Sequence, residues 1–421
     1  MTLRPSPRWV VWFAALELFI LAASNGRPFW TSSGAWVTLT AVILLFGQGF
    51  GKLLNAAFSR PIRHLSIAML LFILVNFFSA VANPSDKAFI EVGLRGILPF
   101  IVYLSLVGLV LRPSDSTLLS YSLAAGAGVM FVRGFFAYVS SVGNLDLHTI
   151  LWARYDSRLM VAYSEATLGN IGRLGGYIVL VFPVAFWAFI SPSHRLSMRF
   201  AMAIICALAV ANLLFCGSRT GLALTAIEIA AIIMARGARS LFLGLVVTFG
   251  LTLATIDSWV SLLISPDLIE RFLPTLGSKG QDNSVVERLA SIEEGWNAFL
   301  DNMAFGIGPG NSIIRNSFAV PHQSVVHQLS ELGIIGGTVF IALCLIILVS
   351  TWHAFLNASR NTNAAHRWVW SSGPAFWVVF GILAGVSFTA SLALAWVGIA
   401  YAMLAIGSAK ILPTRSKQIL R

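Results

Sequence analysis

Long hydrophobic stretches dominate the chain, and polar residues gather in the segments between them. Each stretch has roughly the 16 to 24 residues that a helix needs to cross about 30 Å of hydrocarbon, and helices satisfy their own backbone polar groups inside a bilayer. The pattern predicts about twelve transmembrane helices, at residues 9–24, 34–50, 65–82, 93–111, 117–140, 172–190, 199–215, 220–235, 240–257, 324–350, 372–388 and 391–408. The fold class is therefore an all-α polytopic membrane protein, with residues 1–421 in a single membrane domain.

Composition supports this class. Hydrophobic residues make up 57% of the 421 residues and charged residues only 11%, with a mean hydropathy of +0.82. Soluble domains are about a quarter charged, so a cytosolic enzyme is excluded. The three cysteines lie in or beside apolar stretches and form no CxxC pair, which favours buried apolar residues over a disulfide framework or a metal site.

The net charge of +11 indicates orientation, not a nucleic-acid surface. With the N-terminus in the cytoplasm, the inner loops carry many basic residues and only Asp115 among the acidic ones. These basic residues are Arg4, Arg8, Lys52, Arg60, Arg63, Arg112, Arg195, Arg199, Arg236, Arg239, Arg360, Arg367, Lys410, Arg415, Lys417 and Arg421. Positive loops on the cytoplasmic side predict that both termini are cytoplasmic.

Two outer segments are longer than simple connections, at residues 141–171 and 258–321. The first mixes basic and acidic residues, which suit either a solvated face or an acceptor site. Most inner loops are short and no GxxxxGK[ST] motif occurs, so an ATP-driven pump is disfavoured.

The second outer segment contains a predicted amphipathic helix at about 285–303. Ser284 and Glu287 have the spacing of a capping box, and apolar residues then recur every three or four positions. Such a helix lies on the outer membrane surface or on the bundle. Arg288 is next to these recurring apolar residues, where it serves either as an interfacial anchor or as a functional cation.

A glycine-rich loop, Phe305-Gly-Ile-Gly-Pro-Gly-Asn311, follows this helix. Its spacing fails the dinucleotide fingerprint and no strand precedes it, so a plain loop is favoured over a phosphate loop. Pro321-His322-Gln323-Ser324 then precedes the tenth span, and Glu331 lies in the first turns of that span.

The eighth and tenth spans both begin at the outer side. Helix N-termini attract anions, and Arg219 opens the eighth span while His322 precedes the tenth. This arrangement suits a phosphate-bearing ligand and a neutral, basic imidazole, although a lone interfacial histidine is also a common polar surface residue. His327 is five residues from His322 and would point elsewhere, which argues against a two-histidine metal site.

Arg95 and Arg133 lie toward the outer ends of the fourth and fifth spans. An ionisable group inside a span is costly unless it is paired or functional. Snorkelling of the guanidinium to water is the simpler interpretation of both, and a functional role is the alternative.

In this order, GSRTG at a span start, Arg288 and Trp296 in a loop helix, FGIGPGN and PHQSVVHQLSELGIIGG resemble the O-antigen ligase and O-antigen polymerase superfamily. The match is strongest over residues 216–226 and 284–340. The resemblance implies a GT-C-like, metal-independent inverting glycosyltransferase without a cofactor, in a bacterial inner membrane. The donor would be a glycan on undecaprenyl pyrophosphate, and the acceptor either lipid A core or another glycan chain.

The same resemblance assigns roles to individual residues. His322 corresponds to the catalytic histidine, and Arg219 and Arg288 to the two outer arginines that hold the donor pyrophosphate. Gln323 replaces the asparagine that often follows the histidine. The secondary site candidates are Arg95, Arg133, Asn311, Gln323 and Glu331.

A lipid-linked glycan flippase or another polytopic transporter is the alternative function. A transporter is expected to carry ionisable residues deep in several spans. Only Glu17 and Glu228 lie deep in predicted spans, whereas most charged residues of the spans are near the outer side.

Overall fold

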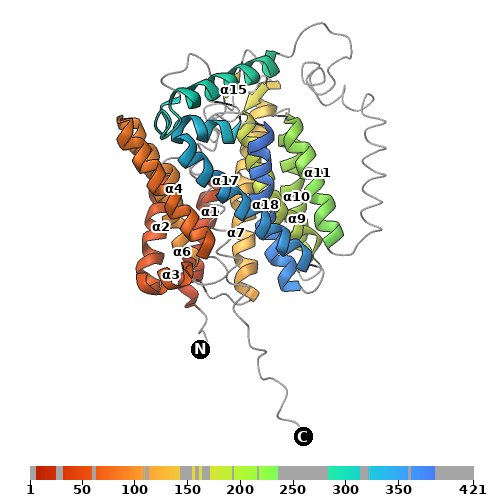
Figure 1. Ribbon diagram of the computed structural model, residues 1–421. Helices are drawn as coiled ribbons and strands as arrows, with labels where there is room; N and C mark the ends of the chain where they lie inside the picture. The colour runs from red at the N-terminus through yellow and green to blue at the C-terminus, as the bar shows by residue number, and fades with distance from the viewer. Residues whose placement is uncertain are drawn as a thin grey trace.

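The computed structural model describes residues 6–24, 32–58, 63–107, 109, 113–142, 154–156, 161–163, 171–191, 194–215, 218–235, 283–312, 321, 323–358 and 362–384. Most of these residues are helical, and the helices form one bundle (Figure 1). Two short strands, β1 (Arg154–Asp156) and β2 (Val161–Tyr163), pair antiparallel within the first predicted outer segment. The bundle therefore agrees with the predicted helical class, and this hairpin is a feature that the hydrophobic pattern missed.

The amino-terminal helices form one side of the bundle. They are α1 (Arg8–Ser24), α2 (Ser32–Gln48), α3 (Phe50–Ala57) and α4 (Arg63–Ala82). The chain bends by 94° between the end of α2 and α3. Gly49 makes this bend with φ of 82°, a conformation that glycine adopts without steric cost.

The next span has an irregular backbone. α5 (Asp86–Val92) continues into a π-helical turn, η1 (Gly93–Ile97), and then into α6 (Leu98–Val107). Pro99 cannot donate a backbone hydrogen bond, and its ring would crowd the carbonyl four residues earlier, that of Arg95. The wider turn directly before Pro99 accommodates this conflict, and such π turns are frequent at functional sites.

The remaining helices complete the bundle and cover one of its ends. They are α7 (Pro113–Val142), α9 (Ile171–Ile190), α10 (Leu196–Phe215), α11 (Arg219–Ala235), α15 (Asn283–Asp301), α17 (Ser324–Ala358) and α18 (Thr362–Ala384). α17 packs against both α4 and α18, so it joins the two sides. α15 lies across the end of the bundle opposite the N-terminus, at the top of Figure 1. We call this end the α15 end.

Among the described residues, five helices are long and apolar enough to cross a membrane, or six if the bent pair of α2 and α3 is one span. Large apolar side chains such as Phe46, Phe78 and Trp352 are exposed on the outside of the bundle, as lipid contact requires. These features indicate a membrane protein. Every predicted span within the described residues overlaps a helix. The spans predicted at 240–257 and 391–408 lie outside those residues, so the number twelve stays a prediction.

The predicted amphipathic helix is present as α15, shifted by two residues from the expected range 285–303. It begins at Asn283, so Ser284 lies inside the first turn and not before it as a capping box requires.

α17 is a broken helix. Gly333 has φ of 66° and ψ of −166°, which interrupts the helical backbone between residues 324–332 and 334–358. The loop at residues 303–311 forms hydrogen bonds with backbone groups on both sides of this break. Ile307 N and Gly308 N donate to the carbonyls of Ser330 and Glu331 at 2.9 Å, and Ile334 N donates to the carbonyl of Met303 at 2.7 Å. The backbone N–H and C=O groups beside the break thus find hydrogen-bond partners in a segment from outside the helix.

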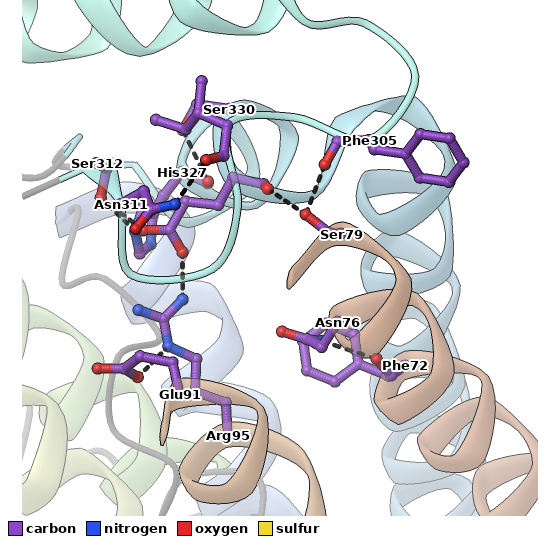
Figure 2. Close-up of polar contacts among 12 residues, drawn as sticks. Phe72, Asn76, Ser79, Glu91, Arg95, Phe305, Asn311, Ser312, His327 and Ser330 are labelled. Carbon is purple, nitrogen blue, oxygen red and sulfur yellow. Dashed lines mark hydrogen bonds and ion pairs between the residues drawn. The ribbon is translucent and has the colours of Figure 1, made fainter. Parts of the chain in front are cut away.

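α4 contributes to the same junction. Ser79 Oγ lies 2.6 Å from the carbonyl oxygen of Phe305 and 2.9 Å from that of Glu331, so its one hydroxyl proton serves either acceptor (Figure 2). Asn83 Nδ2 donates to Gly306 O at 2.9 Å. The junction therefore joins α4, the glycine-rich loop and both halves of α17.

Replacement of Gly333 by alanine tests this junction. The φ of 66° disfavours any side chain, and an added Cβ would overlap the carbonyl of Ala304. We expect Gly333→Ala to lower the free energy of unfolding by at least about 1–3 kcal/mol. Thermal unfolding of the detergent-purified protein measures this change. Gly93→Ala is the matched control, because Gly93 has φ of −61° and a Cβ there meets no atom within 4 Å. Equal unfolding midpoints for the two variants would contradict the proposed importance of the break.

Candidate functional site

A buried cluster of charged side chains lies directly beside the break in α17. Arg95, on η1, is 1% exposed, and its guanidinium forms ion pairs with Glu331 and with Glu91. The Arg95 Nε to Glu91 Oε2 distance is 2.7 Å, and Arg95 Nη1 bonds Glu331 Oε2 (Figure 2). Snorkelling to water is therefore the wrong interpretation of Arg95, since its guanidinium is inside the protein and paired.

The second oxygen of Glu331 is also bonded. Ser312 Oγ donates to Glu331 Oε1 at 2.5 Å, and His327 Nε2 lies 3.0 Å from the same oxygen. His327 and Glu331 are both fully buried and are four residues apart on α17, so they share one face of the helix. The bond requires the hydrogen on His327 Nε2, while His327 Nδ1 has no hydrogen-bond partner.

His327 is a residue whose importance the sequence analysis missed. Its spacing from His322 bears only on a two-histidine metal site. The Glu331 at position i+4 was the available signal, because this spacing places two side chains together on a helix. Glu91, four residues before Arg95, gave a similar signal that was also overlooked.

Asn311 holds the glycine-rich loop in place. It is buried, its Nδ2 donates to the carbonyl of Ile307 at 2.9 Å, and its Oδ1 accepts from Ser85 Oγ at 2.8 Å. Ser85 Oγ in turn accepts from Ala88 N and so caps α5. Gly306, Gly308 and Gly310 all have positive φ, which explains why this loop is rich in glycine. The contacts agree with a plain structural loop.

Gln323 caps the first turn of α17. Its side-chain Oε1 accepts a hydrogen bond from Val326 N at 2.6 Å, which satisfies one of the free amides at this helix N-terminus. Arg133, the remaining secondary candidate, lies on α7 and is partly exposed.

The three main predicted site residues lie on or next to elements that begin or pack at the α15 end. Arg219 is the first residue of α11, His322 directly precedes α17 in the sequence, and Arg288 is in the second turn of α15. His322 itself lies outside the described residues.

The starts of α11 and α17 approach the same turn of α18. Ser324 Oγ donates to Gly381 O at 2.9 Å. On α9, a Cβ added at Gly175 would meet both Ser218, which precedes α11, and Phe380. Two helix N-termini, each with a positive end of its dipole, therefore gather around residues 380–381 of α18.

α15 packs closely against the start of α17 at Gly295. A Cβ added at Gly295 would lie 2.6 Å from Pro321 Cγ and 3.0 Å from Val326 Cγ1. Arg288 is seven residues, or about two turns, before Gly295, so its backbone position is on the side of α15 that packs against α17.

No protein-family model matches the chain, and no curated protein matches it. Helix N-termini, arginines and a histidine together suit an anionic ligand and proton transfer. No group of three or more metal-ligating side chains occurs among the described residues.

The buried cluster predicts a clear order of stability among three proteins. Glu331→Gln removes the carboxylate that bonds Arg95, Ser312 and His327, and leaving a buried charge incompletely paired costs about 3–5 kcal/mol. Glu91→Gln should cost much less, because Glu91 is partly exposed and Arg95 keeps Glu331. Thermal unfolding in detergent should place wild type first, Glu91→Gln close to it and Glu331→Gln far below. A Glu331→Gln protein as stable as wild type would refute a structural role for the cluster.

Proposed function

We propose that the protein transfers a glycan from undecaprenyl pyrophosphate to an acceptor hydroxyl at the α15 end of its bundle. This end would face the periplasm of a bacterium, with the helices in the inner membrane and both termini in the cytoplasm. The enzyme would be an O-antigen ligase or a polysaccharide polymerase of GT-C-like fold. Lipid A core is the acceptor in the first case and a glycan chain in the second, since both activities use the same donor.

The observation that carries the proposal is that three elements with predicted site residues on them or next to them lie at the same end of the bundle. The start of α11 with Arg219, the start of α17 next to His322, and the packed side of α15 with Arg288 all lie at the α15 end. These positions are far apart in the sequence, yet the elements that carry or adjoin them lie at one end of the bundle.

The chemistry needs no cofactor. The acceptor oxygen attacks the anomeric carbon of the donor, and the bond from that carbon to the phosphate oxygen breaks with inversion. His322 accepts the proton of the acceptor hydroxyl. Undecaprenyl pyrophosphate leaves with the bonding electrons, and the guanidinium groups of Arg219 and Arg288 with the two helix N-termini stabilise its negative charge.

Transport of a lipid-linked glycan is the second candidate. It is favoured by Glu17 and Glu228, which are both buried inside the bundle. Glu17 has Ser105 Oγ at 3.3 and 3.4 Å from its two oxygens, and neither oxygen of Glu228 has a hydrogen-bond partner. Buried carboxyl groups of this kind occur in proton pathways of transporters.

Replacement of His322 separates the two functions. Purified protein in detergent, supplied with a polyprenyl-pyrophosphate-linked glycan and an acceptor, should form the glycan product without any membrane to cross. We expect His322→Ala to reduce this product at least about 100-fold, because general base catalysis contributes about 10²–10⁴-fold. His64→Ala is the control, since His64 is exposed at the start of α4, beside the end of α3, whereas the other end of α4 bonds the loop at the α15 end. Wild-type protein that moves the donor across vesicles but forms no product would establish the transport alternative.

Conservative changes of the two arginines test the pyrophosphate role. Lysine keeps the positive charge of Arg219 or Arg288 but loses the paired N–H groups that bind two phosphate oxygens at once. We expect Arg219→Lys and Arg288→Lys each to lower kcat by about 10–1000-fold, with a smaller change in KM for the acceptor. Steady-state kinetics at varied acceptor concentration distinguish the two effects. An unchanged kcat in both variants would remove the arginines from the proposed mechanism.

A further inference from the structure

α15 has three different sides, and only one of them packs on the bundle. Ser291, Gly295 and Phe299 are buried and are spaced by four residues, so they form one side of the helix. Gly295 meets Pro321 and Val326 at the start of α17. This side therefore accounts for the attachment of α15 to the protein.

A second side is apolar and exposed. Leu289, Trp296 and Leu300 are 61%, 45% and 43% exposed, and their spacing of seven and four residues places them in one row. Met303, two residues after the helix ends, is exposed and extends the row. We call these four residues the apolar stripe. Phe299, which is next to Leu300 in the sequence, is buried and belongs to the packed side.

The third side is polar. Glu293, Asn297 and Asp301 are exposed and again spaced by four residues. Around the helix, this polar row lies opposite the packed row, and the apolar stripe lies between the two. A helix seated on a bundle and surrounded only by water has no reason to segregate its exposed residues in this way, whereas a helix at the rim between lipid and water does.

The apolar stripe continues into the lateral surface of the bundle. The carbonyl of Met303 accepts from Ile334 N, and the carbonyl of Phe305 accepts from Ser79 Oγ, so the end of the stripe is fixed beside α17 and α4. Phe305, Ile334 and Ile335 are exposed there, on helices or next to helices that are long enough to cross a membrane. The stripe is thus joined to a surface that faces lipid.

We propose that the apolar stripe of α15 inserts into the lipid leaflet at the α15 end, at the boundary between acyl chains and headgroups. Trp296 suits this depth because its ring is apolar while its indole N–H reaches polar groups. Glu293, Asn297 and Asp301 remain in water. α15 therefore anchors the adjoining loop of residues 303–311, and through it the break in α17, to the membrane surface.

Site-directed spin labels measure this insertion directly. The natural cysteines are first replaced by serine, and the protein is then given one cysteine at a time, as Leu289→Cys, Leu300→Cys, Asn297→Cys or Asp301→Cys. All four positions are exposed, so the labels do not disturb the packed side. Each labelled protein is reconstituted into vesicles of phosphatidylethanolamine and phosphatidylglycerol. Collisions of the label with oxygen, which concentrates in lipid, are compared with collisions with a water-soluble nickel chelate.

We expect the oxygen collision rate to exceed the nickel rate at positions 289 and 300, and the order to reverse at positions 297 and 301. Nickel collisions that dominate at all four positions would overturn the proposal, because the stripe would then face water. Low rates for both reagents at 289 and 300 would also overturn it, because a protein or a second copy of the chain would then cover the stripe. The measurement needs neither donor nor acceptor, so its result is independent of the proposed glycan transfer.

Discussion

The hydrogen bonds that close the break in α17 organise the α15 end of the protein. An unsatisfied backbone group inside a membrane costs several kcal/mol, so a helix cannot be interrupted there without new partners. Gly333 permits the interruption, and the loop that carries Met303, Ile307 and Gly308 supplies the partners. Because this loop directly follows α15, the same contacts determine where α15 ends. The break, the loop and α15 therefore form one structural unit.

The buried ion pairs depend on this unit. Glu331 is two residues before the break, at the carboxyl end of the first half of α17, where a cation such as Arg95 is favoured by the helix dipole. Arg95 comes from the π turn before Pro99, which is the second irregular segment of a membrane helix. Burial of these charges is costly, and the multiple bonds to Glu331 from Arg95, Ser312 and His327 offset that cost. The π turn of η1 and the break in α17 are thus joined through the carboxylate of Glu331.

Much of the helical architecture was predictable because membrane spans have a simple signal in length and hydropathy. The amphipathic period also identified α15 to within two residues at each end. The break at Gly333 was not predictable, since a single glycine in an apolar span is ordinary, and only the docking of a distant loop makes it a break. The pairing of Arg95 with Glu331 was missed for the same reason, because it joins residues 236 positions apart. Local spacing cannot report such contacts.

The distribution of irregular backbone favours the α15 end as the place of function. In membrane proteins, broken helices and π turns are frequent where they line or support a site. Here the break at Gly333, the π turn that carries Arg95 and the glycine-rich loop all lie together at that end. Glu17 and Glu228, in contrast, lie on helices without a break or π turn, α1 and α11. The irregular backbone at the α15 end surrounds paired charged groups. Glu17 and Glu228 are each a single acidic residue within a regular helix. A set of backbone and charged groups that depend on one another is stronger evidence for a functional site than an isolated acidic residue.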